Sequence, residues 1–196
     1  MAFALDTAAQ DLLFREAHTV NNFTDEPVTD GQIQEIYDLV KYGPTSMNGQ
    51  PMRVVLVRTP EARERLVGHM VDSNKTKTAA APLTAILALD TRFHENLSTL
   101  FPHAHDALEI WAPEDFRIAH GRFNVGLQAG YFIIGIRAAG LAAGPMTGYD
   151  PEGINKDFFS DGKHIVLAVV NIGKPGKRAW HDRGPRLDYD QVVTTV

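Results

Sequence analysis

The sequence has 196 residues, a formal net charge of −5 at pH 7 and no cysteine, and 44% of its residues are hydrophobic. This composition is typical of a globular protein, and the length predicts one domain, residues 1–196, with a sizeable core. The negative charge argues against nucleic acid or an anionic membrane as the main partner. The lack of cysteine excludes disulfides, Cys-ligated metal sites and thiol nucleophiles, so redox chemistry would need a bound cofactor.

The start of the chain, Met1 to Asp6, lacks the basic region and long apolar run of a signal peptide. The most apolar stretch, residues 131–144, is too short to span a bilayer and contains Arg137. We therefore expect a soluble, cytoplasmic protein.

Two helices are predicted before the first strand. Residues 6–19 have an apolar face, and a second helix begins where Thr29 is followed three residues later by Gln32, a capping-box pattern. This second helix stops at Gly43 and Pro44. Its apolar stripe has the spacing of a core-facing helix: Ile33, Ile36, Tyr37 and Val40.

The segment that follows, residues 43–51, contains two prolines and two glycines and must be a shaped loop. Its hydroxyls and amides can donate and accept hydrogen bonds, which suits a flat, polar heterocycle. Composition alone favours an ordinary turn between a helix and the predicted strand 53–59.

Helices and buried strands alternate in the rest of the chain. Pro60 begins a helix that runs to about Val71, and a polar segment at 72–78 precedes a buried strand at 82–90. Residues 91–113 are irregular. A long helix then runs from about 113 to 140, and its glycines suggest close helix–helix contact: Gly121, Gly126, Gly130 and Gly135.

A tight loop is predicted at residues 144–150, followed by a short helix from Pro151 and a buried strand at 165–172. We find no internal repeat or linker. The pattern predicts a single α+β domain.

Five segments occur in a fixed order along nearly the whole chain: Phe23 with Pro27-Val28, Pro44-Thr45-Ser46-Met47-Asn48-Gly49-Gln50-Pro51, Asn74 with Lys77, residues 144–150, and Pro185-Arg186-Leu187. In this order and spacing they resemble the nitroreductase family of FMN-dependent oxidoreductases. Leu100-Phe101-Pro102-His103 and Gly144-Pro145-Met146-Thr147-Gly148 resemble the branch that includes malonic semialdehyde reductase.

The resemblance implies a nitroreductase-like fold, in which a mostly antiparallel sheet is wrapped by helices in an intertwined homodimer. Two tightly but non-covalently bound FMN molecules would lie at the subunit interface. The chain has neither G-x-G-x-x-G opening a βαβ unit nor a Walker loop, which disfavours Rossmann and P-loop enzymes. NAD(P)H is therefore expected as a transient reductant.

Before Phe23, the resemblance places the ribityl and phosphate end of FMN near His18, Thr19 and Asn21. Many family members have cationic residues at two of these positions, which here are Ala17 and Asn21. Arg15, one helical turn away, is a candidate replacement, although it is also explained as a solvated side chain at a helix end. The C-terminal Arg186, with Arg183 as the second candidate, matches the basic residues that grip the phosphate.

In the 43–51 loop, the resemblance assigns Pro44, Thr45, Ser46 and Asn48 to the FMN bound mainly by the other subunit. Gln50 and Pro51 are expected to shape the turn into the strand.

Asn74 and Lys77 match the pair that faces the pyrimidine edge of the flavin ring. A fixed ammonium there stabilises the negative charge of reduced flavin, so Lys77 is also a candidate catalytic residue. Without the resemblance, Lys77 is a solvent-facing lysine on a polar helix.

Thr147 and Gly148 match the residues whose backbone approaches flavin N5, and Pro145 and Met146 would pack on the ring. Glycine allows the backbone N–H to come close, which makes Gly148 a candidate catalytic residue. The alternative is a simple turn before the helix that Asp150 caps.

Residues 91–113 would form a lid over the open face of the flavin. His103 in this lid is a candidate catalytic residue, able to bind a carbonyl or donate a proton. His103-Ala104-His105-Asp106 has no third ligand at a typical spacing, so no metal is expected.

We therefore predict an FMN-dependent NAD(P)H oxidoreductase that works in two steps: NAD(P)H delivers hydride to flavin N5 and leaves, and a second substrate takes the hydride. That substrate would be a small aldehyde such as malonic semialdehyde. The alternatives are a general nitroaromatic or quinone reductase, and a flavin-binding protein without efficient turnover.

Overall fold

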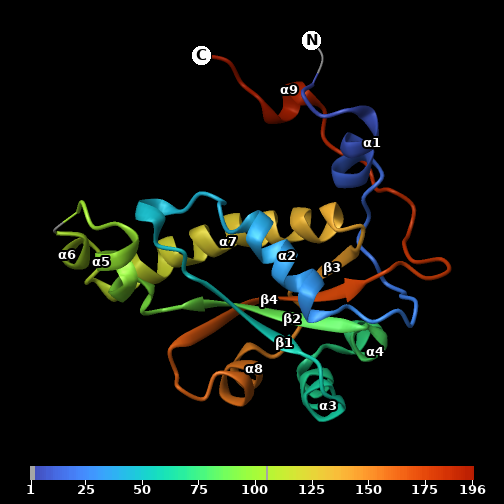
Figure 1. The fold of residues 1–196 in the computed structure, drawn as a ribbon, viewed down its shortest axis with the longest axis horizontal. Coiled ribbons are helices and arrows are strands. Elements are labelled where there is room, and N and C mark those ends of the chain that lie inside the picture. The colour runs from blue at the N-terminus through green and yellow to red at the C-terminus, as the bar shows by residue number, and fades with distance from the viewer. Residues whose placement is uncertain (1–2, 105) are drawn as a thin grey trace.

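A computed structural model describes residues 3–104 and 106–196 of the chain. Its centre is an antiparallel sheet of four strands in the order β1-β2-β4-β3 (Figure 1). The strands are β1 (Met52–Val57), β2 (Leu83–Asp90), β3 (Ala142–Met146) and β4 (His164–Gly173). All residues of β2 except the last are buried, because β2 lies inside the sheet with helices on both faces. The structure confirms the expected sheet and its fold class.

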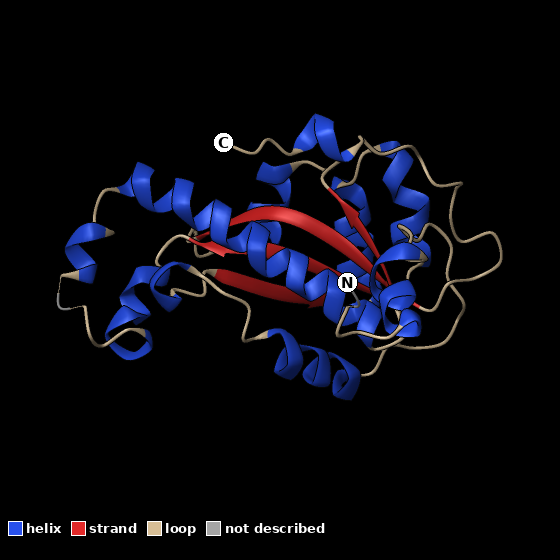
Figure 2. Ribbon diagram, turned by 90° about the horizontal axis from the view of Figure 1, so that it is seen from above, coloured by secondary structure: helices blue, strands red, loops and turns tan. Residues whose placement is uncertain are grey.

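One face of the sheet is covered by α2 (Asp30–Val40) and the long α7 (Glu114–Ala138), which lies across the strands in Figure 2. Ile36, Phe132 and Ile136 pack there against buried residues of the strands. A Cβ on Gly135 would collide with Val40 of α2, so this glycine permits the predicted close contact between helices.

The opposite face is covered by α3 (Pro60–His69), α4 (Asp72–Ala80) and α8 (Pro151–Phe158). Leu66 and Ile154, both fully buried, pack against Ile86 and Val169 of the sheet. Asp150 accepts a hydrogen bond from Glu152 N–H and caps α8, as expected for a helix that begins with proline.

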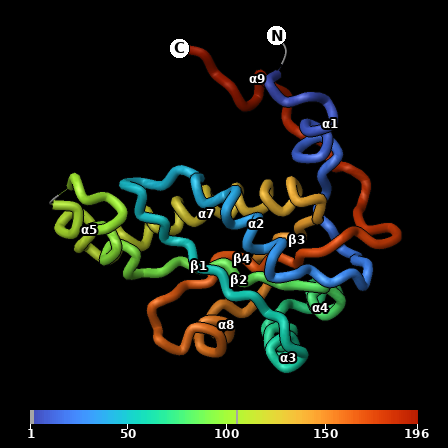
Figure 3. The backbone as a smooth tube through the Cα atoms, in the orientation of Figure 1, coloured from blue at the N-terminus to red at the C-terminus, as the bar shows by residue number. Residues whose placement is uncertain are grey.

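The predicted lid folds as short helical turns at one end of the sheet: a 3₁₀ turn at Phe93–Asn96, α5 (Leu97–Leu100) and α6 (Ala107–Ile110). At the other end, α1 (Thr7–Gln10), a π-helical turn at Asp11–Arg15 and α9 (Tyr189–Val192) extend away from the body beside both termini (Figures 1 and 3).

Five sequence predictions need correction. The first helix ends at Arg15 and not at residue 19. Residues 72–80 form α4, whose buried side is only Asn74 and Thr78 and therefore has no apolar period to detect. Residues 142–146 form edge strand β3, although part of this segment was predicted as a tight loop because of its glycine and proline.

The last two corrections concern α2 and α7. Tyr37 is 55% exposed and does not join Ile36 in the core. It lines an open groove of about 780 Å³ between α2, β1 and α5. A Cβ added to Gly126 or Gly130 of α7 would have no neighbour within 4 Å among the described residues, so these two glycines make no close helix contact within this chain.

Among the described residues, no helix is both long and apolar enough to cross a lipid bilayer.

The capping box at the start of α2 predicts a measurable contribution to stability. Thr29 Oγ1 accepts from Gln32 N–H at 3.2 Å, and Gln32 Oε1 accepts from Thr29 N–H at 2.9 Å. Thr29→Ala should lower the free energy of unfolding by about 1 kcal/mol, measured by urea titration. Thr99→Ala, at an exposed position outside the box, serves as the control and should change it by less than about 0.5 kcal/mol. Equal stability of the two variants would contradict the role of the box.

Candidate active site

Three segments that are distant in sequence meet beside the end of β3. Lys77 Nζ on α4 lies 3.4 Å from Asn21 Oδ1. The Gly148 carbonyl accepts hydrogen bonds from Asn74 Nδ2 at 2.9 Å and from Val71 N–H at 3.2 Å. The structure therefore brings together four of the predicted residues, one from the N-terminal segment, two from α4 and one from the loop after β3.

The backbone at Gly148 is closely packed. A Cβ at this position would lie 2.8 Å from both Asn74 Nδ2 and Val71 Cγ2, so a side chain would displace the amide that holds the loop. The Gly148 N–H has no acceptor among the described residues and remains available to a ligand.

Lys77 is a half-buried cation without an ion pair in the part of the chain that the structure describes. Its polar neighbour is the neutral amide of Asn21. Lys75, two residues earlier, instead pairs with Asp72 at 2.8 Å. The charge of Lys77 is thus free to interact with an anionic or electron-rich ligand.

Residues 18–21 run along β3. Val20 N–H donates to the Ala143 carbonyl at 3.3 Å, and the His18 ring stacks on Trp180 with 5.4 Å between ring centroids. Arg183 donates to the Ala17 carbonyl at 3.2 Å and lies 3.3 Å from His18 Nε2. His18 and Arg183 are therefore neighbours, with Thr19 exposed beside them.

Among the described residues, the side chains of Arg186 and Arg15 do not bond to this group, although Arg183 also donates to the backbone carbonyl of Arg15. Within the described part of the chain, the Arg186 side chain donates only to the carbonyls of Gly184 and Pro185, which precede it in sequence. Arg15 forms an ion pair with Asp11 at 2.6 Å, which makes it a poor replacement for the missing cations.

Arg137 is a basic residue near this group that the sequence did not single out. It donates to the Leu13 carbonyl at 2.9 Å, and its burial, together with the nearby Arg183, lowers its pKa. Arginine still remains charged at neutral pH. The sequence does not mark Arg137 as a site residue, because it lies inside the most apolar stretch of the chain, and that stretch indicates only a buried helix.

The 43–51 loop has an unusual backbone. Met47, Asn48 and Gln50 have φ angles of 50°, 52° and 43°, in the left-handed region that costs roughly 1–3 kcal/mol per residue. The buried Asn124 of α7 holds this conformation: its Oδ1 accepts from Ser46 N–H at 2.7 Å, and its Nδ2 donates to Ser46 Oγ at 3.2 Å.

Within the loop, Gln50 has the structural position expected for it. Its N–H donates to Thr45 Oγ1 at 3.2 Å, and its Nε2 donates to Asn48 Oδ1 at 2.9 Å. Asn48 Nδ2 in turn donates to the Leu100 carbonyl at 2.9 Å. Pro44 and Ser46 are exposed on the surface of the loop that these hydrogen bonds hold.

The 43–51 loop and Lys77 lie at opposite ends of the sheet. The loop lies at the end of β2, because it leads into β1, whose first residue, Met52, pairs with Leu89. Lys77 lies at the start of β2, because α4 leads directly into that strand. At about 3.4 Å per residue, the eight residues of β2 separate these ends by about 25 Å. A single chain therefore does not bring the two groups together.

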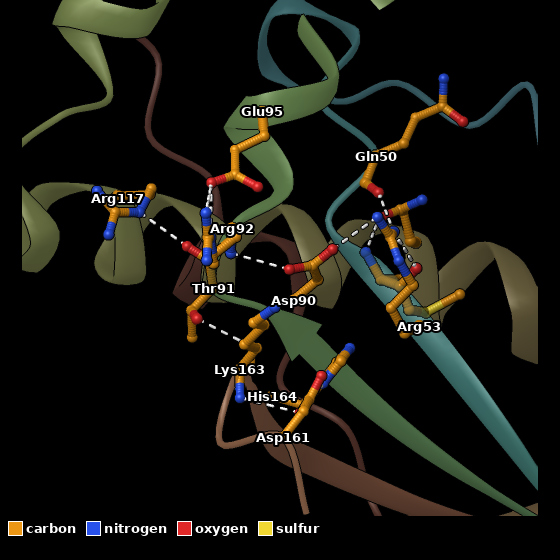
Figure 4. A network of polar contacts seen from close by, with 12 residues as sticks. Gln50, Arg53, Asp90, Thr91, Arg92, Glu95, Arg117, Asp161, Lys163 and His164 are labelled. Carbon is orange, nitrogen blue, oxygen red and sulfur yellow. Dashed lines mark hydrogen bonds and ion pairs between the residues drawn. The ribbon is translucent and has the colours of Figure 1, made fainter. Parts of the chain in front are cut away.

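The base of the lid is fixed by a polar network (Figure 4). Arg53 forms an ion pair with Asp90 at 2.7 Å and donates to the Gln50 carbonyl at 2.9 Å. Arg117 of α7 donates to the carbonyls of Thr91 and Trp111, each at 2.8 Å. These bonds tie both ends of the lid to the sheet and α7.

His103 lies exposed on the lid. The pKa of another lid histidine, His94, is lowered by burial and by the nearby Arg117. Trp111 Nε1 contacts Met47 Sδ at 3.2 Å and links the lid to the 43–51 loop. His105, part of the sequence pattern considered for metal, lies outside the described residues.

Comparison with known proteins supports the family. Residues 14–174 match the model of the nitroreductase family. A Streptomyces coelicolor protein named "Putative NADH dehydrogenase/NAD(P)H nitroreductase SCO5049" is 62% identical over 197 residues, covering 100% of both chains. A Ralstonia nicotianae protein whose name differs only in its final designation, RSc1004, is 44% identical over 193 residues, covering 98% of each chain.

Solved structures agree on the fold. A Bacillus subtilis structure named "putative nitroreductase ydfN" has a TM-score of 0.88 at 20% identity, and the match covers 97% of this chain and 100% of that one. An Exiguobacterium sibiricum structure named "a putative nitroreductase in complex with FMN" has a TM-score of 0.85 at 16% identity, and the match covers 100% of this chain and 99% of that one. The chain belongs to the nitroreductase family.

Proposed function

We propose that the protein binds FMN and is an NAD(P)H-dependent oxidoreductase. One observation carries this proposal: two groups beside β3 have no partner of the complementary kind among the described residues. Lys77 is a cation without an ion pair, and the Gly148 N–H is a backbone donor without an acceptor. The names of the relatives include NAD(P)H nitroreductase, and one solved structure of the same fold holds FMN.

The chemistry of these residues fits a flavin. Lys77 offers an ammonium to the electron-rich pyrimidine edge, and the Gly148 N–H is a donor for a ring nitrogen. Asn74 acts through Gly148, since its amide is engaged with the Gly148 carbonyl. His18 and Arg183 lie toward the other end of β3, where they would bind the phosphate, with Thr19 and Arg186 as further donors.

When bound, FMN would supply hydride transfer at N5, from NAD(P)H and then to an acceptor. The chain would position the ring: the Gly148 backbone would align it, and the exposed Pro145 and Thr147 would border its face. Met146, which was expected to pack on the ring, is instead buried, with its sulfur beside Thr78 and Asn171. Lys77 would stabilise the negative charge that the flavin gains on reduction, because a cation already fixed in a half-buried site does not have to reorient when the charge develops.

The 43–51 loop would serve the flavin of a second copy of the chain. It cannot reach Lys77 of its own chain across the length of the sheet. An apolar stripe on α7 supports a homodimer: Phe123, Leu127 and Tyr131 are 65%, 37% and 44% exposed, and Gly126 and Gly130 between them face open space.

For the acceptor, we propose a small aldehyde such as malonic semialdehyde, on the resemblance of residues 100–103 and 144–148 to that branch. His103 on the lid would contact its carbonyl or donate a proton. The names of the relatives include NAD(P)H nitroreductase and favour a second candidate, a nitroaromatic; a quinone is the further alternative.

The first test is whether the purified protein is yellow and whether NADH or NADPH bleaches it without oxygen. We expect bound FMN and rapid bleaching, followed by reoxidation in stopped-flow mixing with malonic semialdehyde, a nitroaromatic or a quinone. The fastest acceptor identifies the substrate class. A yellow protein that neither nucleotide bleaches would contradict the enzyme, and a protein that does not bind added FMN would contradict the site.

The second test removes the charge of Lys77. Lys77→Met should slow flavin reduction by NAD(P)H at least about tenfold, because the cation stabilises charge that develops during transfer. Lys75→Met, which removes a neighbouring lysine that pairs with Asp72, is the matched control and should keep the wild-type rate. An unchanged rate and flavin potential in Lys77→Met would show that Lys77 does not face the ring.

The third test concerns the homodimer. Phe123→Glu places a charge in the exposed stripe of α7, so we expect a smaller mass by light scattering and a weaker FMN affinity. Ser160→Glu adds the same charge after α8, beyond the other face of the sheet, and should remain dimeric. A dimer of unchanged stability and FMN affinity in Phe123→Glu would exclude this stripe as the interface.

A further inference from the structure

The apolar face of the sheet below α4 contains a small group of polar side chains that the predicted site residues do not include. Asn171 of β4, Thr84 of β2 and Thr78 of α4 are all fully buried. Burying an amide and two hydroxyls is costly unless each has a partner. Their positions therefore need an explanation.

Their hydrogen bonds form a connected network. Thr84 Oγ1 donates to Asn171 Oδ1 at 2.9 Å, and Asn171 Nδ2 donates to Thr78 Oγ1 at 3.3 Å. The sulfur of Met146 lies 3.9 Å from both Asn171 Nδ2 and Thr78 Oγ1, within reach of a weak hydrogen bond. Satisfied networks of this kind hold the groups that they join in one arrangement.

The network touches two of the three segments that supply the site, α4 and β3, and lies one strand away from the third, residues 18–21. Thr78 is one residue after Lys77 on α4, and Met146 is two residues before Gly148. In the sheet, Asn171 pairs with Gly144, and a Cβ on Gly144 would lie 2.7 Å from the Val20 carbonyl, next to Asn21. Asn171 therefore lies below α4 and beside β3, and β3 in turn contacts the 18–21 segment.

We propose that Asn171 is a positioning residue that sets the distance between the Lys77 ammonium and the Gly148 backbone. It acts through Thr78 on one side and Met146 on the other, and it does not touch the flavin. This inference rests on the proposed function, because the distance matters only if both groups face one ligand.

Two variants cut the network. Asn171→Leu removes the central amide at similar volume, and Thr78→Val removes only the hydroxyl that links Asn171 to α4. We expect each to raise the FMN dissociation constant about tenfold, which is the low end of the effect seen when residues that orient metal ligands are changed. We also expect each to shift the flavin reduction potential, measured by dye-coupled titration. The double variant should match the single variants, because all three break the same link.

Val166→Ala is the control for lost stability. It removes buried volume from the same strand at a position outside the network, so it should lower the melting temperature without moving the flavin potential. Thr78→Val is nearly isosteric and keeps the test valid if Asn171→Leu does not fold.

The outcomes separate this inference from the proposed function. If the wild type binds FMN and both network variants keep its affinity and potential, Asn171 has no positioning role and the proposed function is unaffected. A wild type that does not bind FMN overturns both. Potentials that shift in Val166→Ala as much as in Thr78→Val would show that lost stability alone explains the effect, and would also overturn the inference.

Discussion

The arrangement beside β3 depends on how α4 holds the carbonyl of Gly148. Val71 N–H and the Asn74 amide both donate to this one oxygen, at 3.2 and 2.9 Å. The carbonyl is thereby directed into the protein, and the Gly148 N–H remains without an acceptor among the described residues. Because any side chain at this position would strike both Val71 and Asn74, the contact also requires glycine. One packing constraint thus fixes the backbone at Gly148 against α4, the helix that carries Lys77.

The other part of the candidate site, the 43–51 loop, has a strained backbone. Three residues of the 43–51 loop have positive φ, and the loop keeps this shape because α7 and the lid bind it through Asn124, Leu100 and Trp111. The loop and the lid therefore behave as one unit at one end of the sheet. The residues around Lys77 form a second unit near the other end, and the α7 stripe offers a surface by which two chains could bring these units together.

Much of the fold was predictable because its signals are local. The capping box of α2, the prolines that begin α3 and α8 and the apolar run of β2 each act within a few residues. Helix α4 and strand β3 were missed for the opposite reason. The buried side of α4 consists of Asn74 and Thr78, and β3 contains glycine and proline, so neither segment shows the apolar period of its class. Both are stabilised by neighbours distant in sequence.

The sequence by itself determined the residue types of the candidate site and, through the order of five short motifs, the family. Only the tertiary structure decided which of these residues are neighbours. It placed Lys77 against Asn21 and paired Arg15 with Asp11, and the Arg186 side chain bonds to carbonyls of the two residues before it. It also showed Arg137, Asn124 and Asn171 behind the site, where the sequence has no signal for them. The physical reason is that a motif specifies chemistry locally, whereas the partner of a buried polar group is set by the packing of distant segments, as with Thr78 and Asn171, which are 93 residues apart.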